Sequence, residues 1–222
     1  MLKHNRMTTV IQRYCWMSIL LFSVGCGGKP TPISSPATND AKVADTSTPP
    51  AKPVPPKFVA TDQVLIKTSL GNMTFELYGK QAPNTVANFL RYAEQGHFNG
   101  KIFHRVIDGF MIQGGGFDET LNRGETDAPI KLELIPGLKH TAGILSMARQ
   151  PSDIHSATSQ FFICVADAPQ LNGGYAAFGK LISGEETLLA ISRVATHTAE
   201  TDYGSMNDVP IKPVLIETIT RL

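Results

Sequence analysis

One cationic side chain lies inside an apolar stretch that has the composition of a β-strand. Arg105 stands between Phe103 and Ile107, and strict two-residue alternation places the three on one side of that strand. A guanidinium group among apolar side chains costs free energy unless it is paired or used. Arg stays charged when partly buried and has several fixed donors, which suits it to stabilising charge on a bound group. A structural ion pair is the alternative interpretation of Arg105.

Polar residues and glycines follow Arg105 closely. Residues 102–116 read IFHRVIDGFMIQGGG, in which Asp108-Gly109 marks a turn and Gln113 is the next polar side chain. The three consecutive glycines at 114–116 allow the backbone to pass close to another group. This stretch therefore predicts two adjacent strands that carry a cation and an amide.

A second polar and aromatic stretch lies at residues 159–181. It places Gln160 beside Phe161 and Phe162, and a glycine-rich loop follows Leu171. Successive strand residues point to opposite faces, so one phenylalanine belongs to the core and the other does not. We assign Phe161 to the core.

Histidine and cysteine provide no metal site in this sequence. The histidines 97, 104, 140 and 155 form no pair at helical spacing, and no cysteine cluster accompanies them. His104 is expected to face the side of its strand opposite Arg105. Cys164 lies in an apolar strand and is expected to be a small buried hydrophobe. We predict no metal ligands and no disulfide.

Short strands and two helices are predicted to position these residues. Alternating and β-branched stretches joined by glycine turns predict a hairpin and several further strands. The candidate strands are 64–68, 73–78, 102–107, 110–113, 130–133, 143–148, 160–166, 176–181 and 214–220. Helical spacing predicts helices over 83–96, beginning at Pro83, and over 185–194. This pattern favours a closed barrel or a sandwich over a βαβ fold, with the helices covering the open ends of a barrel.

The charge of the chain divides unevenly between its parts. The 222 residues carry a formal charge of +1, but residues 58–222 hold 13 basic and 17 acidic residues, whereas residues 1–57 hold 7 and 2. The larger segment is long enough for one ordinary domain with its own core. Because that domain is formally acidic and has no basic stripe, nucleic acid is not an expected partner.

The first 25 residues have the pattern of a secretory signal peptide. Residues 1–13 contain three basic and no acidic residues, and residues 14–25 read YCWMSILLFSVG without a charge. Gly25 before Cys26 resembles the lipobox of bacterial lipoproteins, although Ser23 stands where that motif usually has Leu. The resemblance implies that Cys26 carries lipid at the mature N-terminus. An ordinary cleaved signal, an uncleaved anchor and a buried core segment are the alternatives.

Residues 26–57 are predicted to form a disordered, proline-rich tether after the lipidated cysteine. Eight of the fifteen prolines lie between residues 27 and 57, and the segment lacks aromatic residues and apolar periodicity. Such a composition favours extended chain. The tether would hold the domain away from a membrane in the cell envelope, facing the periplasm or the exterior. In a Gram-negative cell this would be the outer membrane, because Gly27 stands where lipoproteins retained at the inner membrane have Asp. A proline-rich ligand for a partner groove is the alternative.

Four stretches within residues 62–221 resemble the cyclophilin family of peptidyl-prolyl cis–trans isomerases. They are FHRVIDGFMIQGG, LKHTAGILSMA, SQFFI and FGKL, in the expected order. GGGFDETLNRGETDAPIKLE is similar to the compact bacterial cyclophilins. The resemblance implies an all-β fold, a closed eight-stranded antiparallel β-barrel capped by two α-helices. It also implies proline-containing polypeptide clients and no cofactor. A capped barrel leaves little need for a partner, so we expect a monomer.

The resemblance implies roles for individual residues. Arg105 matches the catalytic arginine, and Gln113 matches the glutamine that bonds the substrate backbone. The matches to the proline-ring pocket are Phe110, Met111, Phe162 and Leu171. The matches to the adjoining peptide groove are Ala148, Arg149, Gln150 and Gln160, where Arg149 replaces an Asn whose main chain makes the contact in eukaryotic members. Tyr175 replaces a His and is expected to close one side of the proline pocket.

Gln170 stands where many eukaryotic members have Trp, which puts tight inhibition by cyclosporin in doubt. Catalysis by this set would need no nucleophile, because rotation of a peptide bond only requires stabilisation of its twisted form. We therefore expect an isomerase that acts on extracytoplasmic proteins. The alternative is a non-catalytic chaperone or scaffold that binds proline-containing segments, for which Arg105 would be unnecessary.

Overall fold

The computed structural model describes residues 58–222. The predicted signal peptide at 1–25, the predicted lipidation site Cys26 and the predicted tether at 26–57 lie outside the described residues. Within residues 58–222, no helix has both the length and the apolar character needed to cross a membrane.

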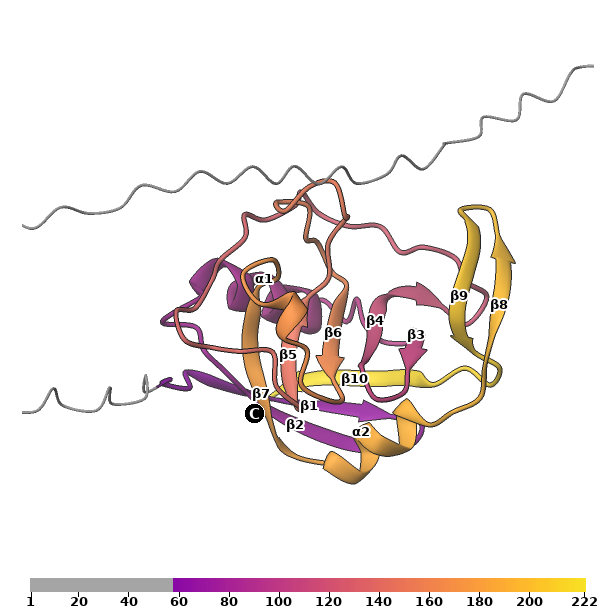
Figure 1. Cartoon of the computed structure of the whole chain (residues 1–222), viewed down its shortest axis with the longest axis horizontal. Coiled ribbons are helices and arrows are strands. Elements are labelled where there is room, and N and C mark those ends of the chain that lie inside the picture. The colour runs from indigo at the N-terminus through magenta and orange to yellow at the C-terminus, as the bar shows by residue number, and fades with distance from the viewer. Residues whose placement is uncertain (1–57) are drawn as a thin grey trace, which may run out of the picture. The chain divides into compact units, whose positions relative to one another are not determined.

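Eight antiparallel strands close into a barrel (Figure 1). Their order around the barrel is β1-β10-β3-β4-β6-β5-β7-β2. The bounds are Asp62–Thr68 (β1), Gly71–Leu77 (β2), Lys101–Ile107 (β3), Met111–Asp118 (β4), Ile144–Met147 (β5), Phe161–Cys164 (β6), Ala177–Ser183 (β7) and Leu215–Arg221 (β10). Closure removes exposed strand edges from the barrel. The predicted fold class is confirmed.

Two helices pack on the barrel from opposite sides (Figure 1). Helix α1, Pro83–Glu94, begins with Pro at its first position and packs on β10, and α2, Glu185–Ser192, packs on β2. Gly184 precedes α2 with a φ of 95°, and its Cα lies so close to the backbone of β2 that a Cβ there would be 2.2 Å from the carbonyl oxygen of Asn72. The helix therefore starts where only glycine fits.

Aromatic side chains fill the inside of the barrel. Phe161 is fully buried, and it meets Phe89 and Phe98 edge-on at ring-centroid distances of 5.5 Å. The assignment of Phe161 to the core is confirmed. The same interior holds Phe75, Phe103 and Phe178 without exposed surface.

The strand predicted over residues 130–133 is wrong. Ile130 forms only an isolated bridge with Ala157, and the segment is otherwise irregular. The Glu133 carboxylate instead accepts hydrogen bonds from the backbone N–H groups of Asn84 (3.2 Å) and Thr85 (2.8 Å) at the start of α1. The segment is held by this capping contact rather than by a ladder partner.

A further hairpin stands outside the barrel, and the sequence-based predictions missed it. Strands β8, Thr196–Thr201, and β9, Gly204–Pro210, form a separate two-stranded sheet beside β3 (Figure 1). Few of its side chains are buried, chiefly Ala199 and Val209, so the periodic apolar signal is weak. Its closeness to β3 brings it next to Arg105.

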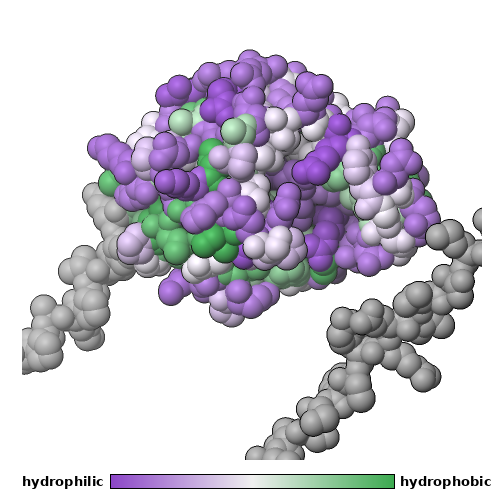
Figure 2. Space-filling model, turned by 90° about the horizontal axis from the view of Figure 1, so that it is seen from above, coloured by the Kyte–Doolittle hydropathy of each residue, from purple (hydrophilic) through white to green (hydrophobic). Residues whose placement is uncertain are grey.

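The surface is mainly polar. Figure 2 shows one face of the molecule, on which hydrophobic side chains gather in one area and hydrophilic side chains cover most of the rest.

Candidate active site

The predicted site residues lie on the outer face of the barrel, over β3, β4, β6 and β5. Arg105 pairs with Gln113, Gln113 pairs with Phe162, and Phe162 pairs with Ser146 across successive strands. Directly opposed residues in an antiparallel sheet point to the same face. The cation, the amide and the aromatic ring therefore form one row outside the barrel.

A β-bulge at His104 directs Arg105 outward. Phe103 pairs with Gly114 and Arg105 pairs with Gln113, so β3 has one residue more than β4 between these pairs. Such an insertion interrupts the alternation of side chains. Phe103 is fully buried inside, whereas the Arg105 side chain is 45% exposed. The prediction that Phe103 and Arg105 share a side of the strand is therefore wrong.

The apolar pocket residues come together beside Arg105. Met111 and Phe162 are 3% and 4% exposed, and Ala148 packs in the same cluster. Phe110, Leu171 and Tyr175 cover this cluster as partly buried side chains. The cluster is separate from the barrel interior, so it offers an apolar surface that a substrate ring can reach from outside.

Tyr175 forms one wall of the pocket. Its ring meets Phe162 edge-on, with centroids 5.6 Å apart and an interplanar angle of 85°. The Arg149 guanidinium lies 4.4 Å from the centroid of the Tyr175 ring, and Arg149 Nε donates to the carbonyl of Gly174 at 2.8 Å. The Arg149 side chain thus holds the Tyr175 ring in place, and the main-chain contact of Arg149 with substrate stays a prediction.

Gln113 and Gln160 form an amide pair next to the pocket. Gln113 Nε2 donates to Gln160 Oε1 at 2.9 Å, and the Gln160 carbonyl accepts from the Ala148 N–H at 2.9 Å. The pair leaves other amide groups free to bind a substrate backbone.

The side chains of Gln150 and Gln170 are exposed and do not pack in the apolar cluster. Gln150 is exposed, and the contacts found for it are made by its backbone: its N–H donates to Ser156 Oγ at 2.8 Å, and its carbonyl accepts from the Arg149 guanidinium at 2.8 Å. Gln170, in the short turn Pro169–Leu171 (η1), is also exposed. The structure thus brings Gln150 near the groove without placing its side chain in the cluster.

His140 packs against the pocket residue Phe162, and the sequence did not predict it as a site residue. Its ring stacks on Phe162 at a centroid distance of 5.9 Å, and its two nitrogens lie 3.1 Å from Asn172 Oδ1 and from Ser146 Oγ. Burial lowers the pKa of His140, although the Asn172 contact acts in the opposite direction. The available signal was its position in LKHTAGILSMA, but nothing in the sequence places it under Phe162.

His104 lies under the polar row in a neutral state. It is 3% exposed and packs on Phe117 at a ring-centroid distance of 4.7 Å. The pKa of His104 is lowered to about 4, mainly by burial; the positive charge of Arg105 adds to this lowering, and hydrogen bonds to Ile102 and Gln160 oppose it. His104 is thus buried against Phe117, whereas the side chain of the neighbouring Arg105 is exposed.

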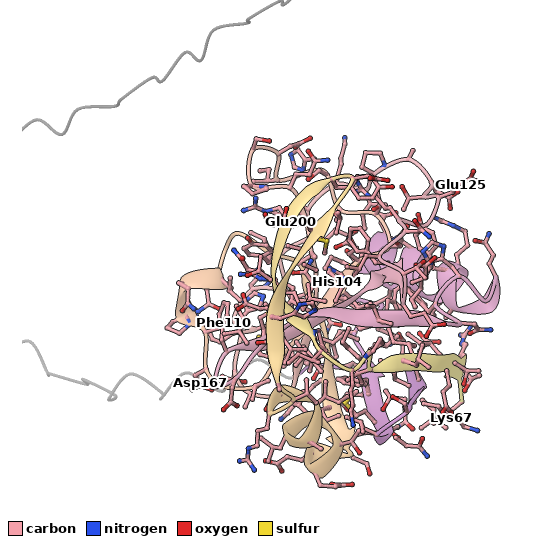
Figure 3. All side chains as sticks on the ribbon, turned by 90° about the vertical axis from the view of Figure 1, so that its right-hand side faces the viewer. Lys67, His104, Phe110, Glu125, Asp167 and Glu200 are labelled. Carbon is pink, nitrogen blue, oxygen red and sulfur yellow. The ribbon has the colours of Figure 1, made fainter. Side chains whose placement is uncertain are left out.

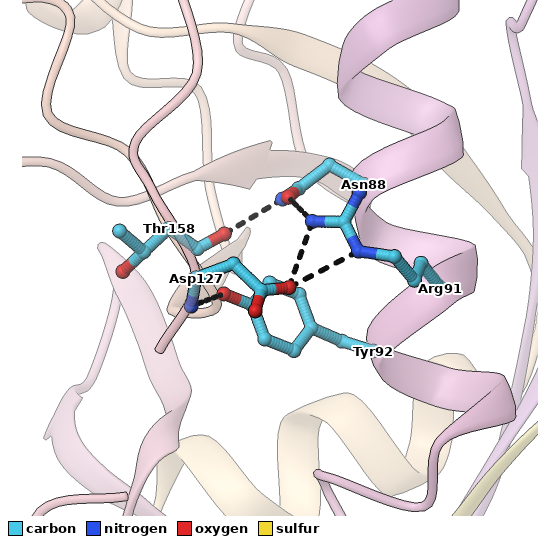
Figure 4. A network of polar contacts seen from close by, with 5 residues as sticks. All are labelled: Asn88, Arg91, Tyr92, Asp127 and Thr158. Carbon is cyan, nitrogen blue, oxygen red and sulfur yellow. Dashed lines mark hydrogen bonds and ion pairs between the residues drawn. The ribbon is translucent and has the colours of Figure 1, made fainter. Parts of the chain in front are cut away.

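A polar network fixes the segment that leads into β6 (Figure 4). Asn88 Nδ2 donates to the carbonyl of Thr158 at 2.7 Å, and Arg91 joins Asn88 to Asp127. The Tyr92 hydroxyl accepts from the N–H of Asp127 at 2.8 Å. Helix α1 therefore holds the chain immediately before Gln160.

Comparison with known proteins agrees with this geometry. The family described as "Cyclophilin type peptidyl-prolyl cis-trans isomerase/CLD" matches residues 63–221. The chain belongs to the cyclophilin family. The activity of this cyclophilin is accordingly peptidyl-prolyl cis–trans isomerisation.

Bacterial relatives of this cyclophilin carry the same activity in their names. A peptidyl-prolyl cis-trans isomerase of Acinetobacter baylyi is 46% identical, covering 72% of this chain and 86% of the relative. Peptidyl-prolyl cis-trans isomerase B of Escherichia coli is 42% identical, covering 71% and 98%. A crystal structure of a Cryptosporidium parvum cyclophilin is 34% identical with a TM-score of 0.61, and covers 72% of this chain and 97% of its own.

Proposed function

We propose that this domain rotates Xaa-Pro bonds of polypeptide clients bound to the outer face of the barrel, with Arg105 as the catalytic residue. The observation that carries the proposal is the single outward row of Arg105, Gln113 and Phe162 beside an apolar pocket. A cation, an amide and a ring-sized apolar surface are the groups that a twisted prolyl bond needs. A Cryptosporidium parvum cyclophilin 35% identical to this chain was crystallised in the presence of the dipeptide Ala-Pro, which supports this class of ligand.

The chemical problem is rotation about a bond with partial double-bond character. Its barrier is about 18–20 kcal/mol, and uncatalysed Xaa-Pro isomerisation takes about 10–100 s. At the twisted geometry the prolyl nitrogen becomes pyramidal and gains a lone pair. A donor that bonds this lone pair stabilises the twisted form over both planar forms, and such differential binding lowers the barrier.

Arg105 supplies that donor. Among the described residues, neither of its terminal nitrogens has a hydrogen-bond partner, and its side chain is 45% exposed at the edge of the pocket. A hydrogen bond from a charged donor contributes about 1.5–3 kcal/mol. Since about 1.4 kcal/mol corresponds to a factor of ten in rate, Arg105 accounts for roughly ten- to a hundred-fold.

The remaining acceleration comes from positioning. The pocket around Met111, Phe162 and Tyr175 holds the proline ring, while Gln113 binds the backbone on the other side of the rotating bond. Holding the proline ring and the backbone on the other side of the bond restricts the bound peptide to conformations close to the twisted form.

Arg105→Ala is predicted to reduce turnover on an Ala-Pro peptide by roughly 10- to 100-fold while the peptide still binds. Two-dimensional exchange NMR measures turnover and binding together, and Arg193→Ala, an exposed arginine after α2, is the matched control. Unchanged exchange in Arg105→Ala would defeat the proposed role. An inactive wild-type protein that still binds the peptide would instead favour a binding module.

We infer separately that the domain acts in the cell envelope, attached through lipid on Cys26. The inference rests on the basic and apolar residues 1–25, the small Gly25 before Cys26 and the proline-rich segment that follows. Palmitate labelling in cells should mark the wild-type protein, and globomycin should block its processing. Label that persists in Cys26→Ala would sink this inference without affecting the isomerase proposal.

A further inference from the structure

Arg105 has an acidic neighbour that belongs to the hairpin outside the barrel. Asp208 Oδ2 lies 3.7 Å from Arg105 Nε, and the two side chains are 40% and 45% exposed. Asp208 is part of β9, which packs along β3. Figure 3 views the molecule from this side, with the hairpin that carries Glu200 crossing in front of the strand that carries His104.

The backbone of β9 places Asp208 at this position by an irregularity. Asp208 has a φ of 63°, in the left-handed region that few non-glycine residues adopt. The pairing of β8 and β9 shifts between His197↔Val209 and Ala199↔Met206, which leaves an extra residue on β9. Such bulges redirect a side chain, and residues in uncommon backbone conformations gather at functional sites.

The hairpin is fixed on both sides of the bulge. Val209 is 3% exposed and Ala199 is 8% exposed, so both residues anchor the hairpin by burial. Near the turn, the Tyr203 ring meets Phe117 at a centroid distance of 6.0 Å, and Phe117 in turn packs on His104 beside Arg105. Asp208 is therefore presented from a supported strand rather than from a free loop.

We propose that Asp208 is a positioning residue that orients the guanidinium of Arg105 for isomerisation. This proposal rests on the proposed catalytic role of Arg105. The carboxylate lies nearest Nε, the nitrogen closest to the backbone, and within residues 58–222 neither terminal nitrogen of Arg105 has a hydrogen-bond partner, so both stay available to a substrate. An arginine side chain loses considerable rotamer freedom when it is fixed, and Asp208 imposes part of that cost before substrate arrives.

Two opposite effects of the carboxylate can be separated. Its negative charge weakens the positive field of Arg105 at the prolyl nitrogen, which alone would slow the reaction. Its orienting effect increases the fraction of enzyme with the donor in place. The bulge and left-handed φ that hold Asp208 favour the second effect, so removal of the carboxylate should lower the rate.

The test compares Asp208→Asn and Asp208→Glu in the full-length protein, on an uncharged blocked Ala-Pro peptide. Asp208→Asn should lower kcat and kcat/KM together by roughly three- to ten-fold with KM unchanged, because the Arg105 hydrogen bond that Asp208 prepares forms only in the transition state. Asp208→Glu should recover most of that loss. Asp202→Asn, an exposed acid at the turn of the same hairpin, is the matched control and should leave both constants unchanged.

A spectroscopic measurement separates orientation from a general effect on folding. The Nε–Hε NMR signal of Arg105 should shift in Asp208→Asn, and high salt should move the wild-type signal the same way, because exposed ion pairs are screened. An unchanged or higher kcat in Asp208→Asn, or a loss confined to KM, would overturn the proposal. If Asp208→Asn keeps full activity while Arg105→Ala loses it, the result counts against Asp208 alone; an active Arg105→Ala would count against the proposed function.

Discussion

Gly116 allows the amide side chain of Gln160 to lie directly against the backbone of β4. A Cβ at position 116 would lie 2.5 Å from both Cδ and Nε2 of Gln160, a distance that real Cβ contacts do not reach. The glycine run at 114–116 was expected to let the backbone pass close to another group. The structure identifies Gln160 as the group beside Gly116, and Phe161 as the group beside Gly115.

Gly116→Ala is predicted to displace Gln160 and break its hydrogen bond with Gln113, because the added methyl group and the amide cannot share the space. Turnover on an Ala-Pro peptide should fall roughly ten-fold by loss of positioning. Gly124→Ala is the matched control, since its Cβ would meet the flexible end of Lys101 and, at 3.3 Å, the His97 ring, but not Gln160. Full activity in Gly116→Ala would show that the amide pair does not contribute to turnover.

At the scale of elements, helix α1 depends on an acid from a distant loop. Glu133 accepts four hydrogen bonds from Asn84 and Thr85, two from backbone N–H groups and two from side chains. Burial raises the pKa of Glu133, but these hydrogen bonds outweigh it and hold the pKa below its ordinary value. A carboxylate at a helix N-terminus is also favoured by the helix dipole.

Glu133→Gln is predicted to lower the free energy of unfolding by about 1 kcal/mol at pH 7. The folded pKa is depressed, so the stabilisation is present above the unfolded pKa of about 4.3 and is lost as pH falls through the folded pKa. Urea denaturation of wild type and variant should therefore converge at low pH. Glu125→Gln, an exposed acid in the same long connection, provides the comparison, and a constant difference at every pH would contradict the carboxylate's role.

The elements also show which features the sequence could reveal. The barrel strands were predictable because their alternating side chains divide between a buried interior and an outer face. Residues 130–133 have strand-like composition, but Glu133 is used to cap α1. The hairpin β8–β9 carries little apolar periodicity because it is held by a few contacts, and the bulge at His104 depends on pairing between strands rather than on local sequence.

The same distinction applies to the site. The four matching stretches contain Arg105, the glutamine pair and the pocket residues Phe110, Met111 and Phe162. Asp208 lies outside them, and they contain His140 without indicating a role for it, because each contacts a residue that is distant in the sequence: Asp208 contacts Arg105, and His140 contacts Phe162. Contacts of this kind become visible only when the strands are assembled.

At the scale of the whole molecule, buried neutral histidines make the fold sensitive to acid. Burial lowers the pKa values of His97, His104 and His140, that of His104 to about 4. The folded state then binds fewer protons than the unfolded state between pH 6.5 and about 4. Stability is full above pH 6.5 and is lost as pH falls through this window.

The predicted result is a steady fall in the free energy of unfolding from pH 7 to pH 4.5, measured by urea denaturation. His104→Gln should flatten this dependence by removing its largest contributor, whereas His155→Gln, an exposed histidine, should not. A wild-type stability that does not change over this range would refute the interpretation.

Because Arg105 and the pocket lie on the outer face of a closed barrel, the site needs no chain end to enter it. A polypeptide can lie across an outward-facing groove and continue in both directions, so a proline in the middle of a long chain is as reachable as one near a terminus. Client proteins therefore need to expose only a short extended segment. A nearly folded protein with one prolyl bond in the non-native isomer in a surface loop can be isomerised without unfolding again.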